Sequence, residues 1–275
     1  MTTQAIRCNG GLRIGTDFSG METPAWALKL LNVEAEHVFS CDKESHCRQV
    51  SKYVGSQNIF SDVKKRVVAH MPKVDLYIFG PPCVHCSPMG NQLGVSDPNN
   101  GDLIMAAMEY IQHHKPLAFI MEEVPEFATL EKQRQVFWLC VDNWRKQGYL
   151  VEFEILESSR FGVSQRRRRL YVVGILAASM SNTPLSIPRN RGNGSRPIPL
   201  TEQVDVLPQE KFQVMPDKPG VRQDNVKHHL ERLAFQGVNP FTTPVIITAG
   251  ASKKRSQAVV DTAPTITKAE VVNTS

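Results

Sequence analysis

The chain has 275 residues, of which 41% are hydrophobic and 21% charged, enough for one α/β domain with a sizeable core and a smaller module. The polar residues 1–11 offer no apolar signal core, and no run reaches the ~18 apolar residues of a membrane span, so no membrane association is expected. Six cysteines without framework spacing indicate free thiols and an intracellular location, the nucleus in a eukaryote or the cytoplasm in a prokaryote.

Strand and helix patterns alternate along the first two thirds of the chain. Strands are predicted over residues 12–18, 36–41, 59–60, 74–78, 118–121, 149–156 and 169–176. Helices are predicted over residues 23–31, 43–53, 101–114 and 130–147. In residues 101–114, for example, the apolar residues recur with the i, i+3, i+4 spacing of a helix. This alternation predicts an α/β fold with a doubly wound, mostly parallel sheet.

The composition changes near residue 177. Ten of the 18 prolines fall in the last 95 residues, where we expect only a helix over 224–235 and a strand over 245–248. Residues 177–275 carry 12 Lys and Arg against 8 Asp and Glu, or +4 of the total charge of +5. This modest basicity permits a polyanionic partner. We divide the chain into a domain over 1–176, a small loop-rich module over 177–262 and a final segment over 263–275.

A cysteine, Cys83, follows the predicted strand over 74–78 in the stretch Phe79-Gly80-Pro81-Pro82-Cys83. Open α/β sheets bind ligands at the carboxyl ends of their strands, and two prolines stiffen this loop. A nucleophilic thiolate needs such fixed placement. A buried structural cysteine is the first alternative. The second is a zinc site made by Cys83, His85 and Cys86, although the H-x-E or C-x-E of zinc deaminases does not precede Cys83.

Acidic residues follow two neighbouring predicted strands. Asp42 comes after the second strand and Asp62 after the third. A carboxylate after the second strand is suited to accept hydrogen bonds from both hydroxyls of a ribose. The first turn, over residues 16–20, lacks the G-x-G-x-x-G that cradles a pyrophosphate. The pair therefore favours a nucleoside cofactor without a diphosphate, for which S-adenosylmethionine is the candidate, whereas each aspartate alone is more typical of a helix cap.

The chain resembles DNA (cytosine-5) methyltransferases in four blocks that occur in the order of that family. They are Asp17-Phe18-Ser19-Gly20, Gly80-Pro81-Pro82-Cys83, Glu122-Glu123-Val124 and Gln165-Arg166-Arg167-Arg168-Arg169. The resemblance covers residues 12–176 and implies an S-adenosylmethionine-dependent methyltransferase domain over 1–176. It also implies a target-recognition-like region over 177–262 and a truncated return segment over 263–275.

The resemblance implies a role for each of several residues. Cys83 would add to C6 of a flipped-out cytosine in DNA, and C5 would then accept the methyl group of S-adenosylmethionine. Glu122 would hydrogen-bond or protonate N3, while Arg167 and Arg169 would hold the base and the active-site groups. The alternative for the arginines is a solvated basic run in which alternate residues are exposed. The implied cofactor-binding residues are Phe18, Ser19, Gly20, Asp42, Asp62, Pro81 and Leu103.

The chain also departs from the pattern of that family. Glu123 stands in place of an asparagine and adds a carboxylate near the site, and Glu22-Thr23 replace a glycine pair, which we expect to crowd the methionine end of the cofactor. Val84 and Cys86 replace Gln and Phe. The family continues with a helix and a Gly-Asn-Ser-type segment, so we expect a second chain or a further segment to complete the cofactor pocket. An inactive or partner-dependent binding module and an RNA cytosine-5 methyltransferase are therefore alternatives.

Overall fold

A computed structural model describes residues 11–82, 101–163, 165–180 and 185–189, and short stretches between 228 and 273. Two compact units are present, one made of residues 1–155 and 169–187 and the other of residues 156–168 and 188–275. No helix in the described ranges is long and apolar enough to cross a membrane.

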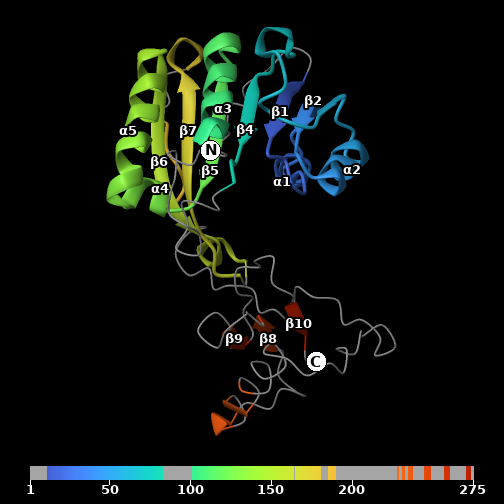
Figure 1. Ribbon diagram of the computed structural model, residues 1–275, viewed down its shortest axis with the longest axis vertical. Coiled ribbons are helices and arrows are strands. Elements are labelled where there is room, and N and C mark those ends of the chain that lie inside the picture. Colours follow the sequence, from blue (N-terminus) through green and yellow to red (C-terminus); the bar gives the residue numbers. More distant parts are fainter. Residues whose placement is uncertain are drawn as a thin grey trace. The chain divides into compact units, whose positions relative to one another are not determined.

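Seven strands form one sheet in the order β3-β2-β1-β4-β5-β7-β6 (Figure 1). They are β1 (Leu12–Asp17), β2 (Ala35–Cys41), β3 (Asn58–Phe60), β4 (Leu76–Phe79), β5 (Ala118–Glu123), β6 (Tyr149–Glu157) and β7 (Arg168–Leu176). Strand β1 pairs in parallel with both β2 and β4, so the strand order reverses between β1 and β4. The predicted doubly wound, mostly parallel α/β sheet is confirmed.

Strand β7 runs antiparallel to β5, with Glu122 opposite Tyr171 and Glu123 opposite Leu170. The cause is the short connection between β6 and β7, which holds only residues 158–167 and the 3₁₀ turn η3 (Ser158–Phe161). A parallel return needs a crossover of a dozen or more residues, usually with a helix. This reversal brings the start of β7, and with it Arg169, beside the end of β5.

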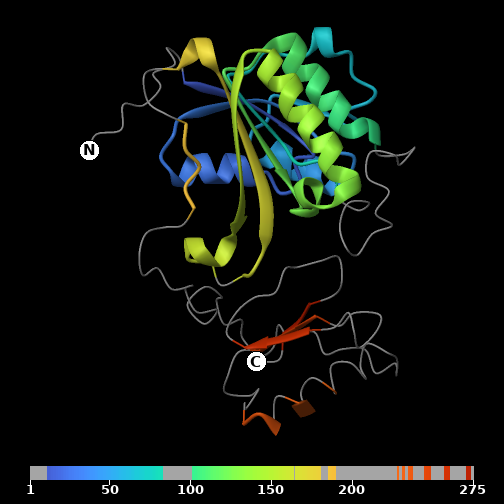
Figure 2. The same cartoon turned by 90° about the vertical axis from the view of Figure 1, so that its left-hand side faces the viewer.

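Five α-helices are described: α1 (Thr23–Leu30), α2 (Ser45–Tyr53), α3 (Gly101–His114), α4 (Glu126–Thr129) and α5 (Glu131–Lys146). Two further 3₁₀ turns are η1 (Val68–His70) and η4 (Ala177–Ser179). Helices α3 and α5 lie side by side on one face of the sheet and α1 lies on the other (Figure 2). The four helices predicted for this part of the chain are confirmed to within two residues at each end, while α4 was not predicted.

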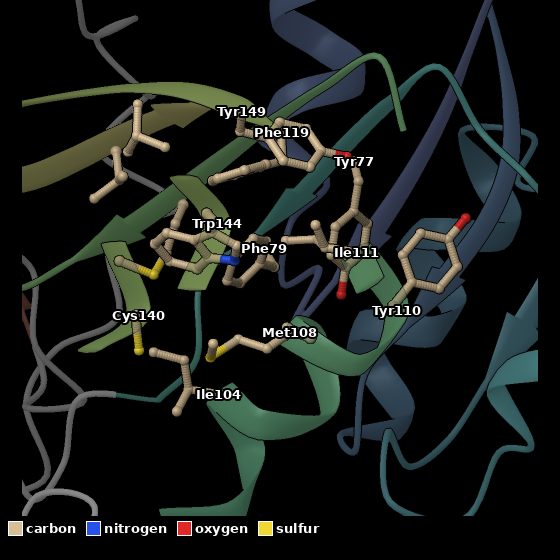
Figure 3. Close-up of a cluster of buried hydrophobic side chains, with 14 of the residues drawn as sticks. Tyr77, Phe79, Ile104, Met108, Tyr110, Ile111, Phe119, Cys140, Trp144 and Tyr149 are labelled. Carbon is tan, nitrogen blue, oxygen red and sulfur yellow. The ribbon is translucent and has the colours of Figure 1, made fainter. Parts of the chain in front are cut away.

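An aromatic core joins the middle of the sheet to α3 and α5 (Figure 3). The ring centroids of Tyr77 and Tyr110 lie 4.5 Å apart, and those of Phe119 and Trp144 lie 4.8 Å apart. Both distances are typical of favourable aromatic pairs. The Tyr110 hydroxyl donates a hydrogen bond of 2.6 Å to the carbonyl of Pro72, so its buried oxygen is satisfied. This packing fixes β4 and β5, whose carboxyl ends carry the candidate site.

The second unit contains a three-stranded antiparallel sheet in the order β10-β8-β9. Its strands are β8 (Val245–Thr248), β9 (Gln257–Val260) and β10 (Val271–Asn273). The predicted strand over 245–248 is confirmed, and the described residues of the predicted helix over 224–235 are helical. Strands β9 and β10 were not predicted, and the division of the chain at residues 176 and 262 stays a prediction.

We expect Gly174→Ala to destabilise the first unit by about 1–3 kcal/mol, because overpacking a core displaces well-packed side chains. Gly174 faces Phe119 across β7 and β5, and a Cβ atom there would lie 2.1 Å from the Phe119 ring. The measurement is the free energy of unfolding in urea. Adding Phe119→Leu to Gly174→Ala should recover part of the loss, and equal stability of Gly174→Ala and wild type would contradict the packing described here.

Candidate active site

The carboxyl ends of β1, β2, β3 and β4 are joined by backbone hydrogen bonds at the point where the strand order reverses. Ser19 N donates to the carbonyl of Cys41 at 3.2 Å, and Asp42 N donates to the carbonyl of Phe60 at 3.2 Å. On the other side of β1, Gly80 N donates to the carbonyl of Asp17 at 3.4 Å. Open α/β sheets bind ligands at such a switch point. The turns after these strands carry six of the seven predicted cofactor residues.

Asp42 holds the first turn and the start of α2 together. Its Oδ2 accepts a hydrogen bond of 2.9 Å from Gly20 N, and its Oδ1 accepts one of 2.9 Å from Glu44 N. The contact with Glu44 lies in the turn before α2 and does not cap the helix, because Glu44 is itself the N-cap residue. A carboxylate offers about four lone-pair sites, so two backbone donors leave Asp42 able to accept further hydrogen bonds. The half-buried Asp42 therefore fits a ligand with hydroxyl groups.

Asp62 lies at the end of β3, where its Oδ1 accepts a hydrogen bond of 2.9 Å from Lys64 N. It also lines a pocket of about 280 Å³ together with Phe60 and Arg66. The remaining predicted cofactor residues are a half-buried Phe18, a buried Ser19, a buried Pro81 after β4 and a half-buried Leu103 near the start of α3. No helix begins at Asp62, since the next helical turn, η1, starts at Val68, so Asp62 does not cap a helix and its role in cofactor binding stays a prediction.

The first residue of the Asp17-Phe18-Ser19-Gly20 block is part of a buried ion pair. Arg66 binds both carboxylate oxygens of Asp17, and the Tyr77 hydroxyl donates to one of them. The side chains of Asp17 and Arg66 are almost fully buried. Burial, followed by the negative charge of Asp17, raises the pKa of the Tyr77 phenol far above its ordinary value. Asp17 thus anchors the end of β1, and the sequence offered no sign of its partner Arg66.

A second buried carboxyl, that of Glu22, lies beneath the first turn. Glu22 has a left-handed backbone with φ of 56° and is fully buried. Its Oε1 accepts a hydrogen bond of 2.6 Å from Ser51, and its Oε2 accepts one of 3.0 Å from Thr16. Burial raises the pKa of Glu22 and lowers that of the neighbouring His37. The expected crowding of the cofactor does not come from the Glu22 side chain, because that side chain is directed into the protein.

Glu122 and Arg169 form an ion pair at the ends of β5 and β7. Arg169 Nε lies 3.0 Å from Glu122 Oε1, and the two side chains are 15% and 33% exposed for Arg169 and Glu122. An arginine that contacts a carboxylate in this way fixes the orientation of the carboxylate. The Glu122 carboxylate is still partly accessible, because its side chain is one-third exposed. The structure therefore brings together two of the four predicted catalytic residues.

The segment after β4, which leads to Cys83 in the sequence, begins beside the Glu122 carboxylate. A Cβ atom added to Gly80 would lie 3.4 Å from Glu122 Oε2 and 3.4 Å from its carbonyl oxygen. One carboxylate oxygen of Glu122 thus contacts Arg169 while the other lies next to Gly80. The described part of the loop ends at Pro82, so Cys83 lies outside the described residues, as do His85 and Cys86. The described residues contain no cluster of three or more His, Cys, Asp or Glu suited to a metal.

The arginine run alternates in exposure. Arg166 and Arg168 are exposed, whereas Arg167 and Arg169 are half-buried, as expected for a segment that enters a strand. In the second unit, Arg167 N donates to Ser158 Oγ at 3.0 Å, and Ser158 N donates to the carbonyl of Arg167 at 3.0 Å. These bonds close the connection between β6 and β7. A catalytic role of Arg167 stays a prediction.

The sequence profile of C-5 cytosine-specific DNA methylases matches residues 15–253. The chain belongs to this family. The Type II methyltransferase M.NgoBI of Neisseria gonorrhoeae is 25% identical over 240 residues, which cover 82% of this chain and 69% of that protein. The Type II methyltransferase M.HaeII of Haemophilus aegyptius is 26% identical over 203 residues, or 74% and 58% of the two chains. The cytosine methylase family member described here thus spans between about three fifths and seven tenths of the length of these relatives.

Solved structures confirm the fold of this methylase family member. The S. pombe Dnmt2 methyltransferase matches with a TM-score of 0.59 and 16% identity over 82% of this chain and 66% of that one. A Spodoptera frugiperda DNMT2 mutant matches with a TM-score of 0.58 and 18% identity over 79% and 65% of the two chains. The sheet of this chain therefore has the S-adenosylmethionine-dependent methyltransferase fold.

We expect Glu22→Gly to destabilise this methylase family member by about 1–3 kcal/mol, because the buried Ser51 hydroxyl loses an acceptor. Thermal unfolding is the measurement. Asn32→Gly is the matched control: Asn32 also has a positive φ, of 53°, but is exposed after α1, so its replacement should change stability little. If Glu22→Gly were as stable as Asn32→Gly, the hydrogen bonds of Glu22 would contribute nothing to the stability of the protein.

Proposed function

We propose that this chain transfers a methyl group from S-adenosylmethionine to C5 of a cytosine in DNA. The observation that carries the proposal is the Glu122 carboxylate, which is held by Arg169 on one side and adjoins Gly80, at the start of the Pro-Pro-Cys loop, on the other. Family membership supports the reaction class. The same juxtaposition supports a site in which a thiol and a carboxyl act on one bound base.

Cys83 is proposed as the nucleophile. It follows Gly80 by three residues, so the backbone can carry it at most about 10 Å from that glycine. Its sulfur would form a bond to C6 of the cytosine, which makes C5 electron-rich enough to accept a methyl group. Loss of the C5 proton would then break the bond between carbon and sulfur and restore the thiolate. S-adenosylmethionine supplies the methyl group when it is bound.

Glu122 is proposed to hold a proton at N3 of the same base. When C6 is attacked, negative charge develops in the ring, and an acid in contact with N3 stabilises that charge. The ion pair with Arg169 fixes the Glu122 carboxylate and limits its rotation. Arg167 is proposed to assist in holding the base. Because C6 cannot be reached in a stacked duplex, the target cytosine must be flipped out of the helix.

The residues at the switch point would hold the cofactor. Asp42 would accept hydrogen bonds from the ribose hydroxyls, while the turn of Phe18, Ser19 and Gly20 would surround the methionine end. Asp62, Pro81 and Leu103 would border the adenine base of the cofactor. The fit rests on Asp42, which is fixed by two backbone donors and keeps acceptor capacity. A further segment or a partner chain that completes the pocket stays a prediction.

DNA is favoured over RNA as the acceptor by the description of the family and by the Type II methyltransferase relatives. Methyl transfer from labelled S-adenosylmethionine to duplex DNA and to RNA, compared in one assay, distinguishes the two acceptors. Cofactor binding without any transfer would instead favour a binding module that needs a partner for turnover.

We expect Asp42→Ala to weaken S-adenosylmethionine binding by at least about tenfold, the effect of losing hydrogen bonds to a charged acceptor. Isothermal titration calorimetry measures the dissociation constant. Asp75→Ala is the matched control, because Asp75 Oδ2 also accepts a backbone hydrogen bond, from Arg13 N at 2.9 Å, but precedes β4 at the opposite edge of the sheet. Equal affinities of the two variants would rule out the Asp42 assignment.

We expect Cys83→Ser to abolish methyl transfer and to prevent covalent trapping on a 5-fluorocytosine oligonucleotide, because a serine hydroxyl is a far weaker nucleophile. Cys86→Ser in the same loop is the control and should retain both activities. Undiminished transfer by Cys83→Ser would refute the nucleophile assignment. Loss of activity in both variants, together with bound zinc in the wild type by elemental analysis, would establish the zinc alternative.

A further inference from the structure

A second carboxyl, that of Glu123, follows Glu122 at the end of β5. Successive side chains of a strand point to opposite faces of the sheet. The Glu122 side chain is accordingly one-third exposed, whereas Glu123 is only 5% exposed. Glu123 therefore lies just behind the proposed catalytic acid and cannot itself contact a bound base.

Among the residues that the structure describes, few groups around Glu123 stabilise a negative charge. Its Oε2 accepts a hydrogen bond of 2.6 Å from Val124 N. The charged groups that act on it are Glu122 on β5, Arg169 on β7 and Glu126 on α4, of which only the arginine favours ionisation. Burial is the largest effect and raises the pKa of Glu123 to about 8. At neutral pH the carboxyl is therefore mostly protonated.

The proton on Glu123 determines how many negative charges surround Arg169. While Glu123 is neutral, Glu122 is the carboxylate paired with Arg169 at 3.0 Å. Once Glu123 ionises, a second negative charge is created directly behind Glu122, on the adjacent residue of the same strand. Like charges on adjacent residues repel one another in a low dielectric, and the charge of Arg169 then acts on both carboxylates.

We propose that Glu123 is a positioning residue, whose bound proton keeps the Glu122–Arg169 pair in its active arrangement and whose ionisation disables it. The proposal rests on the proposed catalytic role of Glu122. It explains how the chain accommodates a carboxyl at a position where the resembling family carries an asparagine: the protonated side chain is a neutral hydrogen-bonding group, as the amide is.

The first test is the pH dependence of kcat/KM for methyl transfer by wild type and Glu123→Gln. Above about pH 8, wild-type activity should fall about tenfold for each pH unit as Glu123 loses its proton. Glu123→Gln, which cannot ionise, should lack this fall, so the ratio of the variant to wild type should rise with pH. Glu126→Gln, the control, should keep the alkaline fall. A ratio for Glu123→Gln that stays constant from pH 7 to 9.5 would overturn the proposal.

The second test does not need turnover. In protein labelled with ¹³C at the glutamate carboxyls, the resonance that disappears in Glu123→Gln should titrate near pH 8. The resonance that disappears in Glu122→Gln should shift with the same midpoint in wild type and not in Glu123→Gln. A Glu123 resonance that titrates near pH 4.5 would refute the inference. Absence of methyl transfer at every pH would instead refute the proposed function. The titration of the Glu123 and Glu122 resonances would still test the inference in that case.

Discussion

The parallel pairing of β4 with both β1 and β5 is the constraint on which the candidate site depends. It brings the turn after β1, residues Gly80 and Pro81 after β4 and the carboxylates at the end of β5 to one edge of the sheet. The aromatic packing of Tyr77, Tyr110 and Phe119 holds these strands against the helices, so the edge is built on a rigid core. A site assembled from strand ends needs such rigidity, because catalytic groups must be placed to within a fraction of an ångström.

Buried charges and carboxyls surround this edge, and each is stabilised in a different way. Arg66 and Tyr77 donate hydrogen bonds to the carboxylate oxygens of Asp17. Glu22 is stabilised by hydrogen bonds from Ser51 and Thr16. Among the described residues, Glu123 accepts one backbone hydrogen bond, and burial raises its pKa to about 8. A buried carboxyl without a partner is costly when ionised, so partner and protonation together decide its charge.

The two carboxyls that set this chain apart from the pattern of its family are both directed inward. Glu22 replaces a glycine within the first turn, yet its side chain fills the space between β1 and α2 and not the open side of the turn. Glu123 replaces an asparagine and lies behind Glu122. Neither side chain reaches the surface. Both residues can therefore affect the site only through the strands and helices that position it.

The sequence alone determined the order and approximate limits of the strands of the first unit and of its helices other than α4, and it indicated the residues at the switch point, because hydrophobic periodicity and turn residues are local properties of the chain. It missed β9 and β10, which are short and lie in a segment rich in proline. Only the tertiary structure decided that β7 runs antiparallel, that Arg66 serves Asp17 across 49 positions of the chain, and that Glu22 and Glu123 are buried. Those outcomes depend on which side chains meet after the sheet closes, and both the direction in which a side chain points and the charge it carries follow from its neighbours in space.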